Sequence, residues 1–556
     1  MTESARAAPV AGNGSERLSL ATKLAYGAGD MGPAMTANAL AFYLLYFLTQ
    51  VAGLPPGLAG SVLAISRVWD AINDPAIGLL SDHTRLRWGR RLPWMLFGSV
   101  PFGLLFFAQW LVPRFSDSDP LNTWALFGYY VLIGILFQLG YTAVNLPYTA
   151  LTPELTQDYN ERTSLTSFRF AFSLGGSILA LVLASMIFAA YPQDSQQQYR
   201  VWGAAIALLA VVPLLWCVLG VRERGRPALL ARSQQRQLGG GLIAASLGLL
   251  AYGIAQGLGW VPPPVAARPV SLTVTALLAA LLLPFGLTLR WGQREANLQA
   301  APPASSERQP ELGWRAQLRI AIGNRPFRYI VGIYLCAWLA VQLTAAVLPY
   351  FVVSWLGLAE AAFPRVALAV QGSAIVMLFV WQAASQRLEK QTVFLLGAGV
   401  WVGVQAGLFA LQPAQAAGAY ALAVLAGIGI AVAYLIPWSM LPDAIDLDEL
   451  QTGQRREGLF YAFLVVLQKL GLALALLLVG QGLDWAGFVE SQAGEPAPQQ
   501  PASALLAIRI AIAPLPAVFL LAAMGLAYRY PLDRARHRAI RRQLQQRAAG
   551  TEPPSA

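Results

Sequence analysis

Charged residues are scarce in this chain. Only 12% of its 556 residues are Asp, Glu, Lys or Arg, whereas 56% are hydrophobic. A soluble domain of ordinary composition carries about twice that charged fraction. Apolar runs of about 18 residues or more recur along the whole sequence, and each is long enough to cross a hydrocarbon core of about 30 Å. The sequence therefore predicts an all-α polytopic membrane protein.

Cysteine and histidine are equally rare, with two of each. Cys217 and Cys336 lie in apolar runs, which argues against a disulfide framework or a thiolate metal site. His83 and His537 lie in basic segments far apart in the sequence, so a histidine metal centre is not indicated. We find no nucleophile–histidine pair and no phosphate-binding loop. The sequence does not point to an enzyme, and no cofactor is expected.

The net charge of +11 is distributed as in a membrane protein. Basic residues gather in alternate loops, at 81–91 and 222–236, and in the C-terminal tail. This is the positive-inside pattern, and it predicts that both termini are cytoplasmic in the cell (inner) membrane. The first residues lack the layout of a cleaved signal peptide. The expected partners are a small-molecule substrate and membrane lipid, with no nucleic acid.

Fourteen membrane spans are predicted, in an arrangement of six, two and six. The first six lie near 26–51, 57–80, 92–113, 123–150, 166–190 and 200–221, and the last six near 327–356, 364–386, 392–411, 418–441, 458–483 and 504–528. Two further runs, 239–260 and 271–291, stand between them; the alternative for this pair is an interfacial or re-entrant hairpin. Basic loops at equivalent places make the two groups look like a repeat around a central cavity.

These spans divide the chain into five parts. We expect a disordered cytoplasmic N-terminus (1–22), an N-terminal six-helix bundle (23–222), a central linker with two extra transmembrane helices (223–324), a C-terminal six-helix bundle (325–530) and a basic cytoplasmic tail (531–556).

Two carboxylates stand inside the second span. Asp70 and Asp74 are four residues apart and share one helix face, with Asn73 beside them. A charge at membrane depth is costly, so such residues face a cavity or a partner. Two carboxylates and an amide oxygen are suited to Na⁺, and a neighbouring pair of carboxylates can also share a proton. The alternative is an internal salt bridge with Arg67 or another cation.

Lys469 is the most informative of the other polar residues at membrane depth, because its own helix offers nothing nearby to neutralise it. We expect it to pair with Asp70 and Asp74 across the interface between the two bundles. Loading of the site with Na⁺ or H⁺ would then release this attraction and couple the cation to a conformational change.

A charged junction follows the tenth span of the twelve in the two bundles. It holds Asp443, Asp446, Arg456 and Glu457 among other charges. One interpretation is a solvated loop. The other is a gate whose acids pair with the loop arginines when the cytoplasmic mouth closes, although single surface ion pairs stabilise little. These arginines are Arg85, Arg87, Arg90 and Arg91.

Five motifs in order resemble the glycoside–pentoside–hexuronide:cation symporters of the major facilitator superfamily, which include the melibiose permease. They read "YGAGD", "RVWDAINDPAIG", "WGRRLPW", "YTAVNLPYTALTPELTQDYNERTSLTSFR" and "PDAIDLDELQTGQRREGLFYAF". The likeness covers nearly all of both bundles and excludes the central two-span segment. It implies the major facilitator fold, two six-helix bundles that open alternately to either side.

The resemblance also implies roles for individual residues. The cation-binding positions of the family are matched by Asp70, Asn73, Asp74 and Thr142, with Asp70 and Asp74 as Na⁺ ligands if sodium is the coupling ion. Functional basic residues in the fifth and eleventh spans are matched by Arg169 and Lys469, and an aromatic residue beside the sugar by Tyr434. The sugar-binding positions depart from the family, because they are Ala34, Asn145 and Thr149 here.

The sequence thus predicts a secondary active transporter that couples Na⁺ or H⁺ to uptake of a sugar, glycoside or uronate. The residues expected to face the substrate are Asn145, Arg169, Tyr434 and Lys469. One alternative is a cation-coupled carrier of lysophospholipids or other amphiphiles. Another is a membrane assembly or pigment-binding scaffold that transports nothing, which would have no need for the paired acids.

Overall fold

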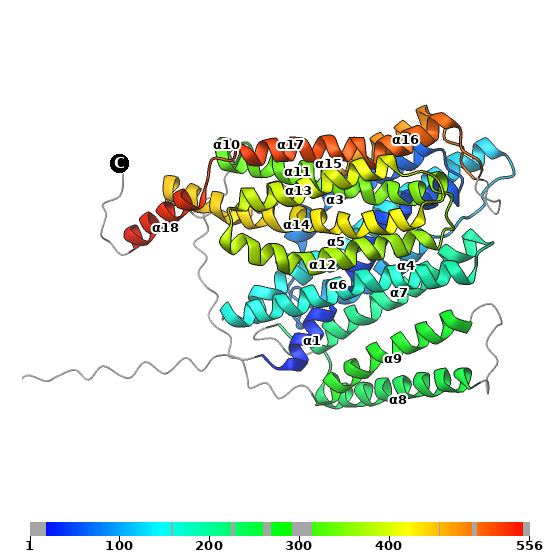
Figure 1. The fold of residues 1–556 in the computed structure, drawn as a ribbon. Coiled ribbons are helices and arrows are strands. Elements are labelled where there is room, and N and C mark those ends of the chain that lie inside the picture. The colour runs from blue at the N-terminus through cyan, green and yellow to red at the C-terminus, as the bar shows by residue number, and fades with distance from the viewer. Residues whose placement is uncertain are drawn as a thin grey trace, which may run out of the picture.

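The structure is a computed structural model that describes residues 18–156, 159–223, 227, 229–258, 268–291, 314–454, 456–491 and 498–548. Most of the N-terminal segment predicted to be disordered, part of the central linker and the last residues of the tail lie outside these ranges. What is described is almost entirely helical (Figure 1). A helix satisfies its own backbone hydrogen bonds, which is what apolar surroundings demand of a chain.

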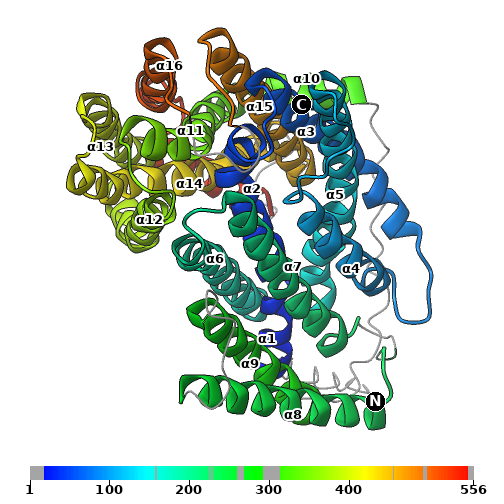
Figure 2. The same cartoon turned by 90° about the vertical axis from the view of Figure 1, so that its right-hand side faces the viewer.

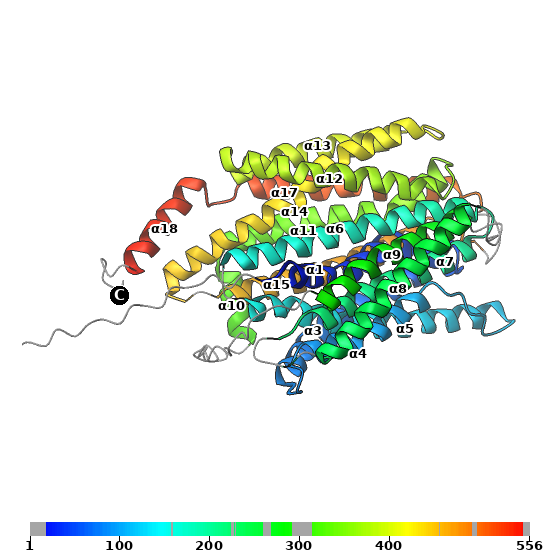
Figure 3. The ribbon, with the colours of Figure 1, turned by 90° about the horizontal axis from the view of Figure 1, so that it is seen from below.

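Long helices run side by side along one axis in two groups (Figures 1 and 3). The N-terminal half comprises α1 (Leu20–Ala28), α2 (Met31–Gln50), α3 (Pro56–His83), α4 (Leu92–Ala108), α5 (Asp119–Leu155), α6 (Tyr159–Ala190) and α7 (Ser195–Gly220). The C-terminal half comprises α11 (Arg325–Tyr350), η2 (Phe351–Trp355), α12 (Ala362–Arg387), α13 (Lys390–Ala410), α14 (Ala416–Thr452), α15 (Glu457–Trp485), α16 (Ala502–Ile512) and α17 (Pro514–Tyr528).

The two halves meet along three helix pairs. In the view down the helices, α3 packs on α15, α2 on α11 and α6 on α12 (Figure 2). One end of the bundle holds the short helix α10 (Trp314–Gly323), the C-terminal helix α18 (Arg534–Ala548) and the loop 84–91 (Figure 1). We call it the basic end. The other end is called the opposite end. The paired acids of α3 lie between the two ends.

Helices α8 (Arg232–Gly257) and α9 (Arg268–Trp291) form a hairpin outside both halves (Figure 2). They pack on each other, and α9 also packs against α7. There the Trp216 ring stacks on Phe285 at 6.0 Å, and its Nε1 atom donates a hydrogen bond to Thr288 Oγ1 at 2.9 Å. Both helices are long and apolar enough to span a membrane.

In the described part of the chain, twelve segments are long and apolar enough to span a membrane. By length and hydropathy alone, the predicted count of 14 membrane spans is therefore not reached. The two predicted spans left out are α3 and α4. Helix α3 carries Arg67, Asp70 and Asp74 near its middle, and α4 is only 17 residues long. Both nevertheless stand among the long helices of the N-terminal half (Figure 2).

The interpretation of the charged junction as a solvated loop is wrong for residues 442–452. Helix α14 continues through Pro442 as far as Thr452, and Gly453 ends it with a φ of 69°. Asp443 and Asp446 are buried, as are Ala444 and Ile445 between them. The helix continues because its inner face is apolar and its acids find partners on neighbouring helices.

Close packing of α3 on α15 depends on two glycines. A Cβ atom at Gly480 would lie 2.5 Å from Pro56 O and 2.8 Å from Gly60 Cα. Such small residues let membrane helices approach each other closely. Gly482, two residues further along α15, has no neighbouring atom within 4 Å of the same position.

We therefore expect Gly480→Leu to lower the thermal unfolding midpoint of the purified protein, because overpacking costs about 1–3 kcal/mol. Gly482→Leu is the matched control and should leave the midpoint close to that of the parent. Equal midpoints for the two variants would contradict the packing described here.

Candidate functional site

The paired acids of α3 face Thr142 of α5. The Thr142 hydroxyl lies 3.3 Å from Asp70 Oδ1 and 3.0 Å from Asp74 Oδ1. Asp70 is only 2% exposed, and Thr142 is buried beside it. Asn73 is buried too, but its Nδ2 atom is directed at the carbonyl of Gln138 at 3.5 Å. Three of the four predicted cation ligands therefore converge, while the amide nitrogen of the fourth is directed at the α5 backbone.

Lys469 of α15 reaches this pair of carboxylates from the other half. Its Nζ atom lies 2.9 Å from Asp70 Oδ2 and 2.5 Å from Asp74 Oδ2. Arg67 approaches Asp70 from the same helix, with 4.0 Å between Nη1 and Oδ2. The predicted pairing of Lys469 is confirmed. The two alternatives, a cation site and an internal salt bridge, thus involve the same oxygen atoms.

A second ion pair lies at the break between α1 and α2. Asp30 is the last residue before α2, and its Oδ2 accepts a hydrogen bond from Arg169 Nε of α6 at 3.1 Å. The Arg169 guanidinium also stands over the ring of Tyr148 at 5.6 Å, and Tyr148 stacks on Tyr26 at 5.0 Å. Arg169 is therefore neutralised within its own half.

The C-terminal half supplies an aromatic cluster. Trp338 of α11 meets Tyr434 of α14 edge to face at 5.6 Å, and Trp438 contacts Tyr334 at 5.5 Å and Tyr461 at 5.9 Å. Tyr434 is 41% exposed. Among the described residues no acceptor lies within hydrogen-bonding distance of the buried Trp338 Nε1. Sequence reasoning missed Trp338, because tryptophan in an apolar span is ordinarily a packing residue.

Asn145, the remaining predicted substrate residue, is half-buried on α5. It lies three residues after Thr142, so both side chains share one face of the helix. The structure thus places Asn145 one turn along α5 from Thr142, Arg169 beside Asp30, and Tyr434 in the aromatic cluster.

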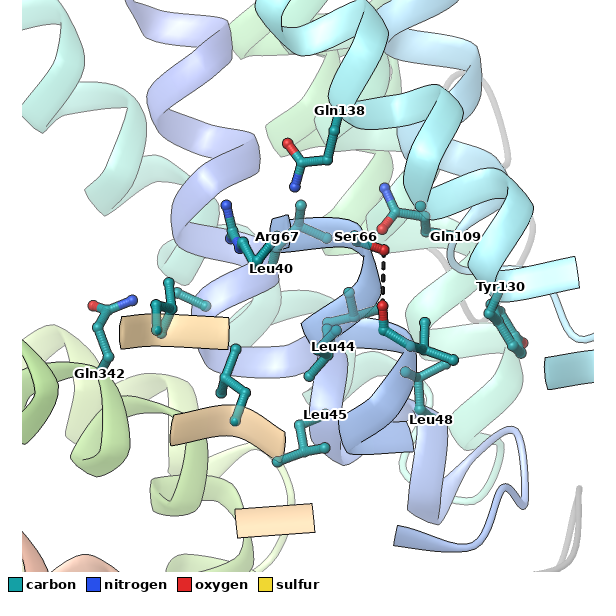
Figure 4. A pocket seen from close by; sticks show the side chains of 16 residues that line it. Leu40, Leu44, Leu45, Leu48, Ser66, Arg67, Gln109, Tyr130, Gln138 and Gln342 are labelled. Carbon is teal, nitrogen blue, oxygen red and sulfur yellow. Dashed lines mark hydrogen bonds between the residues drawn. The ribbon is translucent and has the colours of Figure 1, made fainter. Parts of the chain in front are cut away.

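A small cavity lies beside Ser66 and Arg67 of α3, just before Asp70 in the chain (Figure 4). Its volume is about 30 Å³, enough for one or two water molecules. Leucines of α2 close it, while Ser66, Arg67, Gln109, Gln138 and Gln342 supply polar groups. The Gln109 Nε2 atom is buried with no acceptor among the described residues.

Three of the four predicted gating arginines, Arg87, Arg90 and Arg91, make contacts within the N-terminal half. Arg91 donates to Ser81 Oγ at 2.7 Å and also pairs with Asp82. The backbone N–H groups of Arg90 and Arg91 donate to the Glu223 carboxylate at 2.8 and 2.6 Å. The Arg87 guanidinium lies over the neighbouring Trp88 ring, and Arg85 is exposed. Sequence reasoning missed Glu223, because its partners are backbone groups that carry no sequence signal.

The acids of the junction have partners in the C-terminal half and its tail. Asp443 pairs with Lys390 at 2.7 Å, and Asp446 lies 3.0 Å from His537 Nε2 of α18. Arg456 lies 3.9 Å from Asp448, and Glu457 is exposed in the first turn of α15. The contacts of Asp443, Asp446 and Arg456 described here lie within the C-terminal half and its tail. The predicted gate between the arginines and the acids stays a prediction.

Contacts between the halves instead close the opposite end. Thr49 and Tyr350 share a hydrogen bond of 2.7 Å. The amides of Asn38 and Gln371 bond each other at 3.1 and 3.3 Å. Their residue types were visible in the apolar spans, but their pairing depends on how the halves dock.

Comparison with known proteins places this arrangement in a family. The sequence profile of the family described as MFS/sugar transport protein matches residues 25–242 and 225–534. A protein of Synechocystis sp. named as an uncharacterized symporter is 56% identical over 536 residues, which cover 96% of this chain and 98% of that one. The sodium-dependent lysophosphatidylcholine symporter 1 of Gallus gallus is 27% identical over 95% of this chain and 90% of its own length.

Solved structures support the same fold. The crystal structure of a D-xylose-proton symporter matches with a TM-score of 0.54 and 14% sequence identity, and covers 91% of this chain and 96% of its own. A likeness at that identity concerns the fold alone. Taken with the profile match along both halves, it leads to one conclusion: this chain is an integral membrane protein that belongs to the MFS/sugar transport protein family.

Proposed function

We propose that this protein is a cation-coupled symporter whose coupling ion, Na⁺ or H⁺, binds between Asp70 and Asp74. The observation that supports this best is the contact of Lys469 with both carboxylates across the two halves. A bound cation competes with the lysine ammonium for the same oxygens, so it changes an interaction that joins the halves. Thr142 offers a further oxygen ligand at the same place.

Coupling then follows from charge balance. Removing one partner of a buried ion pair costs about 3–5 kcal/mol, so Lys469 leaves the acids only when another cation takes its place. If the basic end faces the cytoplasm, closure of the opposite end corresponds to the inward-facing state of the proposed cycle. We propose that the loop arginines and the 443–457 segment pair when the basic end closes.

The positive-inside pattern supports an orientation with the basic end and both termini in the cytoplasm of a cell (inner) membrane. Helices α3 and α4 complete a count of 14 spans in this proposal, since they stand among the long helices of their half (Figure 2). The sequence motifs support placing the chain with the glycoside–pentoside–hexuronide:cation symporters within the wider family.

The proposed substrate is a zwitterionic lysophospholipid. Three acids and three bases at membrane depth pair with one another: Asp30, Asp70, Asp74, Arg67, Arg169 and Lys469. A zwitterion can exchange partners with such ion pairs without changing the total charge at membrane depth. Its phosphate suits Arg169 or a released Lys469, and its quaternary ammonium suits the aromatic faces of Trp338 and Tyr434. The similarity to lysophosphatidylcholine symporters supports the same choice.

A sugar or glycoside is the second candidate. The family description names sugar transport, and aromatic faces with a few polar groups also bind sugars. The sugar-binding positions of the melibiose permease, two of which hold aspartates there, are matched by Ala34, Asn145 and Thr149 here, and the loss of two carboxylates removes acceptors for sugar hydroxyl groups.

The carboxylate Asp74 provides the direct test of the coupling site. We expect Asp74→Asn to abolish the stimulation of lysophosphatidylcholine uptake by Na⁺ or by a proton gradient in proteoliposomes, because one of the two charges that attract the cation is gone. Asp117→Asn, at an exposed carboxylate of a loop at the opposite end, is the control and should transport as the parent does. Uptake by Asp74→Asn that keeps its cation dependence would refute the assignment.

Thermal unfolding should identify the substrate class. A ligand at 100 times its Kd stabilises the folded state by about 2.7 kcal/mol. We expect lysophosphatidylcholine to raise the unfolding midpoint more in NaCl than in choline chloride, and neutral glycosides or uronates to have little effect. Stabilisation by a glycoside alone would replace the first candidate with the second.

The aromatic cluster makes a finer prediction. Replacing Trp338 with leucine should weaken lysophosphatidylcholine binding about 2- to 30-fold, in line with a cation–π interaction of roughly 0.5–2 kcal/mol. Binding of lysophosphatidic acid, which lacks the quaternary ammonium, should change little. Trp485→Leu, at an exposed residue far along α15, serves as the control. An equal loss for both lipids would contradict the role of Trp338 in headgroup recognition.

A further inference from the structure

A carboxyl group lies among the contacts that join the two halves at the opposite end. Glu360 belongs to the turn between η2 and α12 of the C-terminal half, outside the membrane-spanning segments. Tyr46 of α2 donates a hydrogen bond to its Oε1 atom at 3.3 Å, and Ser195 at the start of α7 donates to Oε2 at 3.4 Å. Both donors belong to the N-terminal half, so Glu360 bridges the two halves.

The surrounding contacts show that this bridge belongs to the closed interface. The ring of Tyr46 lies 5.2 Å from that of Tyr350, edge to face. The hydroxyl group of Tyr350 is in turn hydrogen-bonded to that of Thr49. Separation of the halves at this end would therefore break the contacts of Glu360 and admit water to its carboxyl group.

The groups that face Glu360 are uncharged. Among the described residues they are the hydroxyl of Ser195 and the phenols of Tyr46 on α2 and Tyr199 on α7. Burial raises the pKa of the Glu360 carboxyl, and the hydrogen bonds from Tyr46 and Ser195 offset part of this effect.

The charged side chains on the neighbouring helices are directed elsewhere. Arg365, the fourth residue of α12, is exposed and donates to Ser185 Oγ of α6 at 3.4 Å. Asp194, which caps α7, is exposed and accepts from the Gln197 backbone. Burial in an interface of neutral hydroxyl groups favours the protonated carboxyl.

We infer that Glu360 is a proton-binding site that the transport site does not include: it holds a proton while the halves are closed at the opposite end and releases it to water when they open. The ligand is the proton itself, and the bond made and broken is the carboxyl O–H bond. This site is distinct from Asp70 and Asp74, which Lys469 and Arg67 neutralise.

The sign of the pH dependence follows from this exchange. Opening hydrates the carboxyl group, so its pKa returns toward the ordinary value. Protonation of Glu360 therefore stabilises the closed form. This stabilisation is fully present at pH values below the ordinary pKa of a glutamate. It is lost as the pH rises through the raised pKa of the closed form. Alkaline conditions on that side thus favour opening.

Distance measurements between the halves test the inference without any substrate. Spin labels are attached at Gln193→Cys and Gln412→Cys, which are exposed residues of loops at the opposite end, one from each half. The native Cys217 and Cys336 are replaced by alanine. Double electron–electron resonance in choline chloride, from pH 5 to pH 9, should show the longer distance gaining population as the pH rises.

Substitutions then assign the effect to Glu360. Glu360→Gln keeps the size and neutral charge of the protonated group, so it should keep the short distance at every pH. Tyr46→Phe removes a donor that favours the ionised form, so its opening midpoint should move to higher pH. Asp117→Asn, on an exposed loop at the same end, should behave as the parent.

A distance distribution that does not change with pH in the parent overturns the inference. So does a Glu360→Gln protein that opens with pH as the parent does, or a Tyr46→Phe midpoint that moves to lower pH. Because neither Na⁺ nor a substrate is present, these outcomes are independent of the proposed symport activity, which is measured separately by uptake.

Discussion

The contact of Lys469 with Asp70 and Asp74 is the constraint on which the rest of this structure depends. A lone ammonium or carboxylate at membrane depth costs several kcal/mol, so neither side can be separated from the other without a substitute. The lysine belongs to α15 and the acids to α3, and these two helices pack closely at Gly480 and Gly60. Electrostatics and packing therefore hold the same pair of helices together, and a competing cation acts on the interface itself.

The two ends of the bundle are built from different kinds of interaction. At the opposite end, the halves are joined by neutral hydrogen bonds such as that between Thr49 and Tyr350. At the basic end, ion pairs such as Asp443 with Lys390 hold each half together internally. Neutral hydrogen bonds contribute only about 0.5–1.5 kcal/mol each, so the closed end is held by several weak contacts that can be exchanged. Such an interface suits a protein that must open and close.

The fold could be predicted largely from hydropathy, because each span must be apolar over a length set by the bilayer. The paired acids and Lys469 could be identified since charge is rare in such spans. Other features could not be found in this way. The burial of Asp443 and Asp446 depends on partners from distant segments, Lys390 and His537, and Glu360 lies in a turn whose neighbours come from α2 and α7. A single sequence does not show how such segments meet.

The charges at membrane depth also restrict what can move through the protein. Arg169 is occupied by Asp30, and Lys469 by the two acids of α3. A cargo that carried one uncompensated charge would leave a buried partner unpaired, at a cost larger than most single contacts recover. In the proposed mechanism, a cation that frees Lys469 would remove this obstacle for a group of negative charge, while the aromatic faces of α11 and α14 would receive a positive one. Under that proposal, charge balance requires the cation to bind first and the cargo second.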